Sequence, residues 1–182
     1  MAKSNIDKSL RDLLLDNIRS VPNFPKPGII FKDITPLLND RYLLELTSRL
    51  LAEPFRGMKI DYVAGLESRG FLFGTNLAQD LHAGFIPIRK SGKLPSTTES
   101  VEYELEYGTD SLEVHTDSLA PGDKVLIHDD LMATGGTSAA ATRLIEKLGG
   151  VVVGYSFVME IKALGGHRSL DSSLPIHTLL NV

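Results

Sequence analysis

The sequence lacks several features that would point to particular classes of protein. It has no cysteine among its 182 residues, which excludes a disulfide framework and a thiolate metal site. It has no long apolar segment and no signal-like N-terminus, so we expect a cytoplasmic protein that does not enter a membrane. Lysine and arginine form no run and the net charge is −4, so binding to nucleic acid is not expected. The five histidines show no His-x-x-x-His spacing, which argues against a histidine metal cluster.

The composition and the hydrophobic pattern fit one α/β domain spanning residues 1–182. Apolar residues make up 42% and charged residues 23%, values that are ordinary for a globular protein. Short β-branched runs alternate with helical patterns, which predicts a parallel sheet covered by helices. Pro87 suggests that the strand over 84–90 lies toward a sheet edge. The polar segment 96–102 is expected to be a mobile loop.

The most informative stretch is Lys124–Ser138. It begins as a buried strand, ends in the adjacent carboxylates Asp129 and Asp130, and continues through a glycine turn into a helix that opens at about Thr137. Glycines let backbone N–H groups approach an anion, and the start of a helix adds unpaired N–H groups and a positive dipole end. The turn is therefore expected to hold a phosphate at the carboxyl end of a strand.

The two carboxylates need a separate explanation, because they would repel a phosphate bound beside them. A ligand that carries a phosphate at one end and a polyol or a metal a few ångströms away, such as ribose 5-phosphate, removes this conflict. A Walker P-loop fits poorly because the Gly-Lys-Ser/Thr ending is absent, and no Gly-x-Gly-x-x-Gly dinucleotide fingerprint is present.

Three further segments can be interpreted in two ways from their residues alone. The proline-bounded segment 23–36 could simply pack, or Phe31 could stack on a flat heterocycle. Arg69, in the turn after a strand, could be a surface residue or could pair with a phosphate. The cations of 89–93 could be solvated surface or could bind an anion.

Residues 125–138 resemble the phosphoribosyl-pyrophosphate motif of the type I phosphoribosyltransferases, which joins an apolar strand, two acidic residues and a Thr-Gly-Gly-Thr-like loop. Residues 24–34, 65–71, 88–95 and 105–108 are similar to segments of the adenine-specific members of that family. The resemblance implies an α/β fold with a central, mostly parallel sheet flanked by helices and a small N-terminal hood from about residues 1–36. It also implies a homodimer that makes AMP and pyrophosphate from adenine and 5-phosphoribosyl 1-pyrophosphate.

The same resemblance assigns roles to individual residues. The 5-phosphate would be held by Ala133, Thr134, Gly135, Gly136 and Thr137, and the ribose hydroxyls by Asp129 and Asp130. The pyrophosphate would be bound by Glu67, Ser68, Arg69, Lys90 and Lys93, with a cis peptide between Glu67 and Ser68. Adenine would be contacted by Ile30, Phe31 and Lys32. Catalysis would involve Glu106 as the acid or base on adenine, together with Arg69, Asp129 and Asp130. The expected cofactor is Mg²⁺, held mainly through the substrate and water and not by direct protein ligands.

Two alternatives and three departures accompany this assignment. A sister transferase for xanthine, hypoxanthine or orotate would keep the phosphate loop but not the hood segment. A non-catalytic sensor of the sugar pyrophosphate could lose Glu106, Arg69 or the loop lysines, all of which are present. His128 stands where an aliphatic residue is usual, Met132 replaces a commoner leucine or isoleucine, and the segment 160–168 carries an extra residue before Arg168.

Overall fold

The computed structural model describes residues 2–104 and 108–182, with side chains described from residue 9 onward. The chain forms two compact units, residues 1–50 and 51–182. The expected hood segment, from about residues 1–36, falls within the first unit. Within the described ranges, no helix is both long enough and apolar enough to cross a membrane.

The first unit consists of helices and one antiparallel hairpin, whose bounds are α1 (Ala2–Asp16), β1 (Arg19–Pro22), β2 (Ile30–Asp33), α2 (Thr35–Asn39) and α3 (Arg41–Ala52). In the hairpin, Arg19 pairs with Asp33 and Pro22 pairs with Ile30. The side chain of Asn23 accepts a hydrogen bond from the backbone N–H of Gly28 at 2.9 Å, which closes the proline-rich loop. Gly28 has a φ of +87°, a conformation that favours glycine there.

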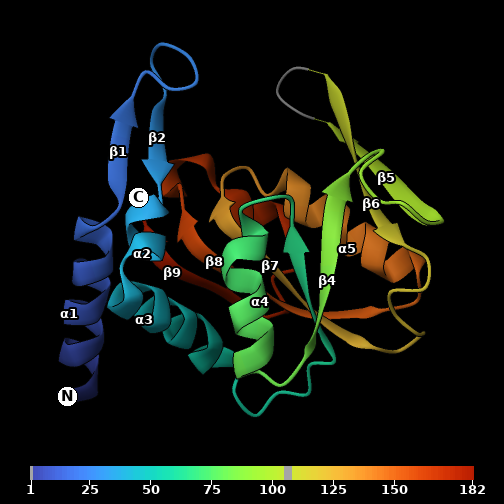
Figure 1. Ribbon diagram of the computed structural model, residues 1–182, viewed down its shortest axis with the longest axis horizontal. Coiled ribbons are helices and arrows are strands. Elements are labelled where there is room, and N and C mark those ends of the chain that lie inside the picture. Colours follow the sequence, from blue (N-terminus) through green and yellow to red (C-terminus); the bar gives the residue numbers. More distant parts are fainter. Residues whose placement is uncertain (1, 105–107) are drawn as a thin grey trace. The chain divides into compact units, whose positions relative to one another are not determined.

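The second unit is an α/β sheet of seven strands (Figure 1). Its elements are η1 (Glu53–Phe55), β3 (Tyr62–Leu66), α4 (Gly70–Asp80), β4 (Gly84–Lys90), β5 (Thr98–Glu104), β6 (Thr109–His115), β7 (Lys124–Met132), α5 (Gly136–Lys147), β8 (Val151–Glu160), η2 (Lys162–Leu164), η3 (Gly166–Ser169) and β9 (Ile176–Asn181). The strand order is β5-β6-β4-β3-β7-β8-β9. The strands from β4 to β9 in this order pair in parallel, whereas β6 and β5 are antiparallel. The predicted mostly parallel sheet is confirmed.

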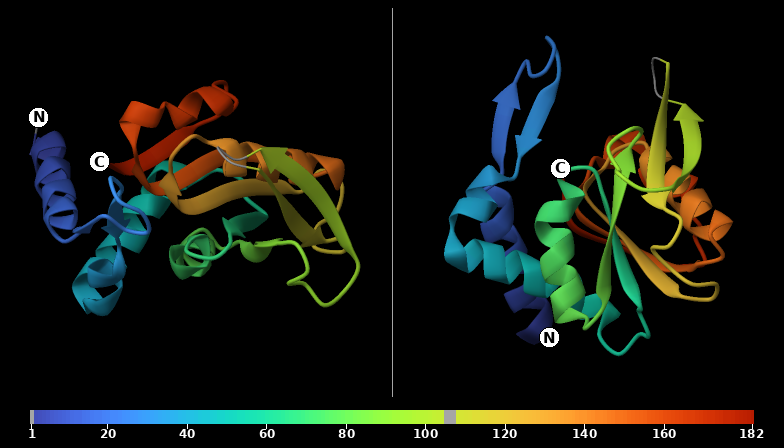
Figure 2. Two further views of the ribbon diagram at one scale, coloured as in Figure 1. Left: turned by 90° about the horizontal axis from the view of Figure 1, so that it is seen from above. Right: turned by 45° about the vertical axis from the view of Figure 1, so that its right-hand side comes forward.

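Helices α4 and α5 cover opposite faces of this sheet (Figures 1 and 2). The alternation of side chains along β3 and β7 explains how both faces are apolar, because successive residues point to opposite sides. On the α5 side the core includes Ala64, Leu66, Val125, Ile127 and, from the helix, Leu144 and Ile145. Both strands are therefore near-continuous hydrophobic runs, as expected for parallel strands buried on two faces.

The order of the strands determines where a ligand can bind. The chain leaves β3 through α4 toward β4 on one side, whereas β7 lies on the other side of β3. The connections therefore run in opposite directions from the β3–β7 pair. In open α/β sheets a crevice forms at such a point, outside the carboxyl ends of the strands. The turns that follow β3 and β7 are the ones whose polar residues stand out in the sequence.

Two expectations about strands are corrected. Residues 96–102 were expected to be a mobile loop, but β5 pairs with β6 over seven residues, from Thr98 to Glu104. The β-forming residues Val101 and Tyr103 face inward on this strand, which favours pairing over a loop. β4 is not an edge strand in the sheet order. Pro87 is tolerated because the β4–β6 pairing involves only Arg89 and Lys90.

Candidate active site

The turn after β7, which we call the β7 loop (Ala133–Gly135), lies at the switch point of the sheet. β7 continues to Met132, two residues beyond the Asp pair that was expected to end it. The two carboxyl groups lie close together, since their side chains interact and Asp129 Oδ1 accepts a hydrogen bond from the Asp130 backbone N–H at 2.8 Å. Asp130 is buried on the side of α4, whereas Asp129 is partly exposed and faces a cavity. The two adjacent carboxyl groups thus differ in how far solvent reaches them.

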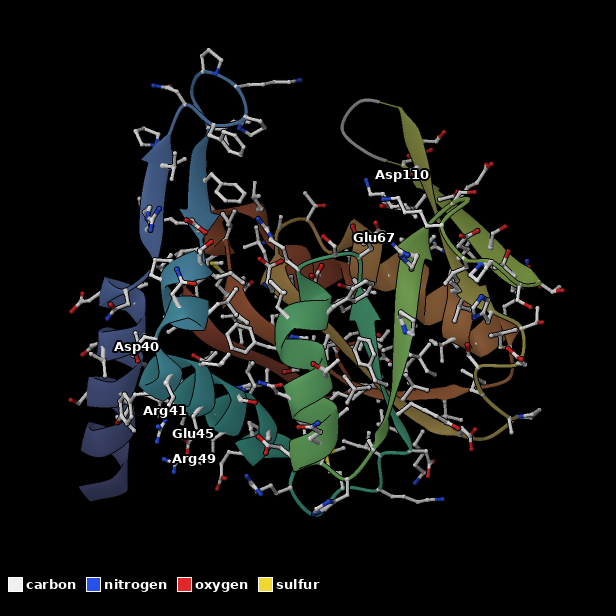
Figure 3. All side chains as sticks on the ribbon, viewed as in Figure 1. Asp40, Arg41, Glu45, Arg49, Glu67 and Asp110 are labelled. Atoms are coloured by element: carbon white, nitrogen blue, oxygen red, sulfur yellow. The ribbon has the colours of Figure 1, made fainter. Side chains whose placement is uncertain are left out.

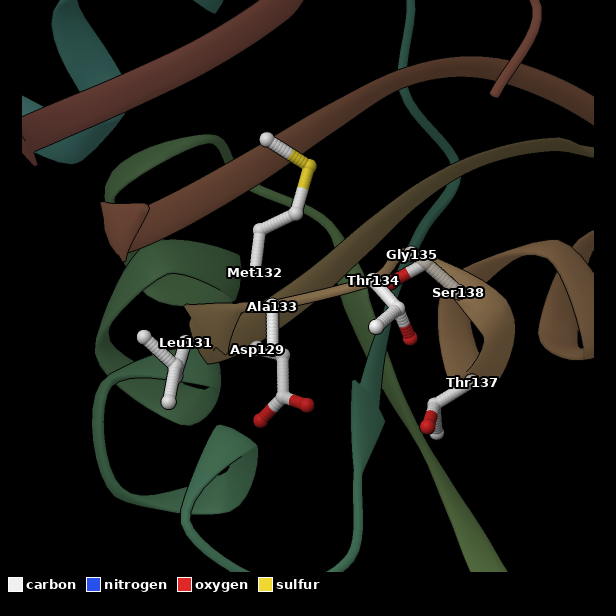
Figure 4. Close-up of a pocket in the computed structure, with 8 residues that line it drawn as sticks. All are labelled: Asp129, Leu131, Met132, Ala133, Thr134, Gly135, Thr137 and Ser138. Atoms are coloured by element: carbon white, nitrogen blue, oxygen red, sulfur yellow. The ribbon is translucent and has the colours of Figure 1, made fainter. Parts of the chain in front are cut away.

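The cavity at the β7 loop is small, and its lining combines polar and apolar side chains (Figure 4). It has a volume of about 70 Å³, and it is lined by Asp129, Leu131, Met132, Ala133, Thr134, Gly135, Thr137 and Ser138. A single water needs about 10–15 Å³ by this measure, so the cavity can hold a group larger than one water molecule. α5 begins at Gly136, one residue before the predicted start, and its free N–H groups and dipole favour a negative charge there.

The β7 loop packs closely on the C-terminal segment η3. Gly135 has a φ of +80°, and a Cβ at this position would overlap the carbonyl oxygen of Gly166. Likewise, a Cβ at Gly166 would overlap the carbonyl oxygen of Ala133. Ser169 Oγ donates a hydrogen bond to the carbonyl oxygen of Thr134 at 2.9 Å. The backbone of the loop is therefore held in place by a segment about 30 residues further along the chain.

The turn after β3, which we call the β3 loop (Glu67–Gly70), contributes a cation to the same edge of the sheet. Arg69 Nε lies 2.7 Å from Asp130 Oδ2. Gly70 starts α4 against β7, where a Cβ would lie 2.8 Å from the carbonyl oxygen of His128. The predicted cis peptide between Glu67 and Ser68 is present. The structure thus brings together Arg69 and the Asp pair, which are about 60 residues apart in sequence.

Glu67 organises the basic residues at the end of β4. Its carboxylate, 7% exposed, accepts hydrogen bonds from Lys93 Nζ at 2.5 Å, from the Lys90 backbone N–H at 2.8 Å, and from Arg89 at 3.3 and 3.4 Å. Burial alone would raise the pKa of Glu67, but these donors lower it to about 2. Glu67 is therefore a fixed negative charge that holds two cationic side chains in one place.

Lys90 belongs to a second charged group beside the first (Figure 3, where Glu67 and Asp110 are labelled). Its ammonium lies 2.9 Å from Asp110 Oδ2 on β6. The hydrogen bond with Asp110 raises the pKa of Lys90, and the same bond lowers the pKa of Asp110. Lys90 therefore remains positively charged near the predicted pyrophosphate site.

Burial strongly affects the residues at the end of β7. Burial and the adjacent charge of Asp130 raise the pKa of Asp129 well above its ordinary value. Burial also raises the pKa of Asp130, although Arg69 acts in the opposite direction. His128 is fully buried, which lowers its pKa to about 4 and keeps the ring neutral at pH 7. A positive charge that approached the Asp pair would be stabilised, because little solvent competes for it.

The residues predicted to contact adenine lie in the first unit, on β2. Ile30 is exposed, and Phe31 packs its ring edge-on against Phe24, with 5.2 Å between the ring centres. Lys32 Nζ donates a hydrogen bond to Ser20 Oγ on β1 at 3.1 Å. Because β2 is a strand, Phe31 points away from the side on which Ile30 and Lys32 lie.

Some residues at the site were not predicted, and one predicted residue cannot be placed. Glu106 falls outside the described residues. Asp110, Gly166 and Ser169 were missed, since each acts through a partner that is distant in sequence. The adjacent glycines Gly165 and Gly166 were the only local signal for the close approach to the β7 loop.

A metal at this site would need oxygen ligands from a substrate. Within residues 2–104 and 108–182, no three histidine, aspartate or glutamate side chains come together in a way that could hold a metal ion. The four cations Arg69, Arg89, Lys90 and Lys93 lie against the carboxylates Asp130, Glu67 and Asp110. A highly charged phosphate ligand would therefore gain from an added divalent cation. The residues present fit Mg²⁺ that arrives with its ligand.

The sequence and the fold are similar to those of known proteins. Residues 37–167 match the model of the phosphoribosyl transferase domain. The chain is 55% identical over 166 residues to an adenine phosphoribosyltransferase of Crocosphaera subtropica, an alignment covering 90% of this chain and 96% of that protein. It is 51% identical to the adenine phosphoribosyltransferase structure from Rhodothermus marinus, with a TM-score of 0.92 and coverage of 96% and 99%.

A third relative, the yeast enzyme from Saccharomyces cerevisiae, was solved with adenine and an imino-altritol bisphosphate. It is 42% identical, with a TM-score of 0.89, and the match covers 95% of this chain and 99% of that one. Together with the parallel sheet, the β7 loop and the Asp pair, these matches show that the chain belongs to the phosphoribosyltransferase family, in the group of the adenine phosphoribosyltransferases.

Proposed function

We propose that this protein transfers the 5-phosphoribosyl group from 5-phosphoribosyl 1-pyrophosphate to adenine, and so makes AMP and pyrophosphate. The observation that carries the proposal is the cavity of the β7 loop directly beside the Asp pair, in a chain about half identical to adenine phosphoribosyltransferases. In the reaction, the bond from ribose carbon 1 to the pyrophosphate oxygen breaks. A bond from the same carbon to a ring nitrogen of adenine forms, and that nitrogen loses its proton.

The β7 loop and the start of α5 hold the 5-phosphate in this proposal. The ligands are the hydroxyl groups and backbone N–H groups of Ala133, Thr134, Gly135, Gly136 and Thr137. The cavity volume, the left-handed conformation of Gly135 and the positive end of α5 all support this assignment.

Asp129 and Asp130 bind the ribose hydroxyls and stabilise the positive charge that develops on the ring as the carbon–oxygen bond breaks. A related oxocarbenium-like state occurs in glycoside hydrolysis. The upward shift in the pKa of Asp129 supports this role, because a poorly solvated pair of carboxyl groups gains most from a nearby positive charge.

The cations of the β3 loop and of β4 stabilise the leaving pyrophosphate. Arg69, Lys90 and Lys93 bind its oxygens, Ser68 offers its hydroxyl, and Glu67 keeps Lys93 and Arg89 oriented. Bound Mg²⁺ would supply charge neutralisation on the phosphate oxygens, held through the substrate and water.

The base is recognised by the hairpin of the first unit. Phe31 stacks on adenine. The side chains of Ile30 and Lys32 point to the other side of β2, so these two residues border the ring through their backbone groups. The match of residues 24–34 to the adenine-specific members of the family supports this proposal. Glu106 would exchange the proton on adenine. A homodimer is a further proposal that rests on the family resemblance, and light scattering of the purified protein tests it. A cytoplasmic location stays a prediction from the sequence.

A steady-state assay with the sugar pyrophosphate and Mg²⁺ tests the function. Adenine, hypoxanthine, guanine, xanthine and orotate are offered separately. We expect AMP from adenine and no product from the other bases. Turnover of a different base would contradict the role of the hairpin. Binding of the sugar pyrophosphate without turnover of any base would identify a non-catalytic sensor instead.

A further inference from the structure

Asp110 contacts Lys90, a predicted pyrophosphate ligand, but is not itself among the predicted ligands. It is the second residue of β6 and lies directly opposite Tyr103 of β5 in the antiparallel register. Lys90 of β4 pairs with Leu112, two residues further along β6, so Lys90 and Asp110 are diagonal neighbours on the sheet. Three neighbouring strands thus bring an acid, a phenol and an ammonium group together.

The contacts show that Asp110 is the centre of this group. Its Oδ2 lies 2.9 Å from Lys90 Nζ and accepts a hydrogen bond from the Tyr103 hydroxyl at 3.4 Å. Its Oδ1 accepts a hydrogen bond from the backbone N–H of Ser111 at 2.8 Å. The carboxylate therefore has a fixed orientation, and it is only 22% exposed, whereas the Lys90 side chain is 53% exposed.

Tyr103 connects this group to the phosphate cavity. Tyr103 is 8% exposed, and the side chain of Thr137, a residue that lines the cavity at the start of α5, interacts with its hydroxyl and acts against burial on its pKa. Two polar contacts further hold β5 on α5, from Arg143 to the carbonyl oxygen of Glu102 and from Lys147 to Glu99 at 2.6 Å. Thr137, Tyr103, Asp110 and Lys90 therefore form a continuous path between the two predicted anion sites.

We propose that Asp110 is a positioning residue, which holds the Lys90 ammonium in place for the pyrophosphate and, through Tyr103, links it to the 5-phosphate site at Thr137. An ammonium group has three N–H donors, so Lys90 can keep Asp110 as a partner and still donate to the pyrophosphate. The long lysine side chain would otherwise lose considerable rotamer freedom on binding, and the fixed carboxylate removes part of that cost before the ligand arrives.

This inference rests on the proposed function, because it assumes that Lys90 binds the pyrophosphate. The test is a double-mutant cycle with Asp110→Asn, Lys90→Ala and the double variant, assayed for the KM of each substrate and for kcat. For Asp110→Asn we expect the KM for the sugar pyrophosphate to rise about tenfold, as for one lost charge-assisted contact, with the KM for adenine unchanged. The double variant should be no worse than Lys90→Ala alone.

Glu99→Gln is the matched control, since it removes another ion-paired carboxylate of the same hairpin that does not contact Lys90. It should leave the KM for the sugar pyrophosphate within about twofold, as for other surface ion pairs. Tyr103→Phe should give a smaller rise in that KM than Asp110→Asn, because the ion pair itself remains. A thermal melt shows whether each variant is folded.

The outcomes separate the two proposals. Independent, multiplicative effects of Asp110→Asn and Lys90→Ala, or an unchanged KM in Asp110→Asn, would overturn the positioning role while the enzyme activity stands. An inactive wild-type protein would instead contradict the proposed function. In that case calorimetric titration of wild type and Asp110→Asn with Mg²⁺ and inorganic pyrophosphate still tests Asp110. Equal affinity in the two proteins would then refute its role.

Discussion

The β3 loop and the β7 loop lie at neighbouring strand ends and differ in the groups with which we propose that they bind an anion. Beside the β3 loop, the cations at the end of β4 already have a protein partner, because Glu67 of that loop accepts hydrogen bonds from Lys93, from Arg89 and from the Lys90 backbone. The β7 loop borders a cavity whose lining includes hydroxyl groups, apolar side chains and the Asp129 carboxyl group but no basic side chain. The difference gives two modes for the proposed phosphate sites, one with side-chain charges that already have a partner in the protein and one with the N–H dipoles of a loop and a helix start.

The two loops are also connected, because Arg69 of the first reaches Asp130 beside the second. Four substitutions, taken from the largest expected effect to the smallest, separate what each loop does alone from what the pair does together.

Gly135→Ala should break the β7 loop. The new Cβ would overlap the carbonyl oxygen of Gly166, and the φ of +80° disfavours any other residue. We expect a loss of about 3 kcal/mol in the free energy of unfolding and the loss of nearly all activity. Gly136→Ala is the control for stability, since its Cβ would meet nothing closer than 3.8 Å. Chemical denaturation of both variants measures the contrast, and equal stabilities would show that the close approach to Gly166 is unimportant.

Asp130→Asn should uncouple the loops. It removes a buried negative charge that lies 2.7 Å from Arg69, and the remaining amide cannot stabilise a positive ring. We expect kcat to fall about a hundredfold, within the range for a lost electrostatic contact to a transition state. Asp123→Asn, which alters only the turn before β7, serves as the comparison. A Kd for the sugar pyrophosphate that worsens as much as kcat falls would contradict a transition-state role.

Glu67→Gln should alter the β3 loop alone, and its effect on stability depends on pH. The pKa of Glu67 falls from an ordinary 4.5 to about 2 in the folded protein. Its stabilising contribution is therefore complete above pH 4.5 and is lost as the pH falls toward 2. At about 1.4 kcal/mol per pKa unit, this is worth up to about 3 kcal/mol at neutral pH, and less where Lys93 and Arg89 lie partly in solvent.

The measurement for Glu67→Gln is the free energy of unfolding between pH 2 and 7 for wild type and variant. The two curves should converge at the acid end and separate as the pH rises through 4.5. Parallel curves over the whole range would show that the charge of Glu67 is not what holds the cations.

Ser169→Ala gives the smallest effect. It removes one hydrogen bond to the carbonyl oxygen of Thr134 but leaves the packing of Gly135 on Gly166 unchanged. We expect a loss of about 1 kcal/mol in stability and a rise of about threefold in the KM for the sugar pyrophosphate. Ser173→Ala, which removes a hydroxyl that bonds only locally to Asp171, is a suitable control. An unaltered KM in Ser169→Ala would mean that glycine packing alone fixes the β7 loop.

The sequence predicted the local order of strand, loop and helix because the hydrophobic pattern and the turn residues of a short segment determine that order. The apolar run from Val125 and the glycines at 135 and 136 agree with the structure. The cis peptide between Glu67 and Ser68, which the family resemblance implied, is also present. Distant partners could not be predicted in this way. The ion pair of Lys90 with Asp110 and the contact of Gly166 with Gly135 depend on how strands and turns are placed, and no local pattern encodes them.

The wrong prediction for residues 96–102 has the same cause, because a partner that is distant in sequence determines the structure of this segment. Its serine, threonine and glutamate residues favoured a loop, but pairing with β6 satisfies the backbone and buries Tyr103. Polar composition is a weak guide where a partner strand supplies the hydrogen bonds. The proton-transfer role of Glu106 stays a prediction from the family resemblance.

The central pairing of β3 with β7 sets the order in which the protein can assemble on the ribosome. Asp61 and Lys124 join the beginnings of these strands through two hydrogen bonds, although they are 63 residues apart. The Asp61 backbone N–H donates to the Lys124 carbonyl oxygen at 2.8 Å, and the Lys124 backbone N–H donates to Asp61 Oδ2 at 2.9 Å. A nascent chain that has not yet exposed β7 can fold β3, α4 and β4 only as a fragment without its central neighbour. Such non-local pairings form slowly, so we expect the phosphate cavity to be a late product of synthesis. Truncated chains that end before residue 124 would then carry Arg69 without the carboxylate that receives it.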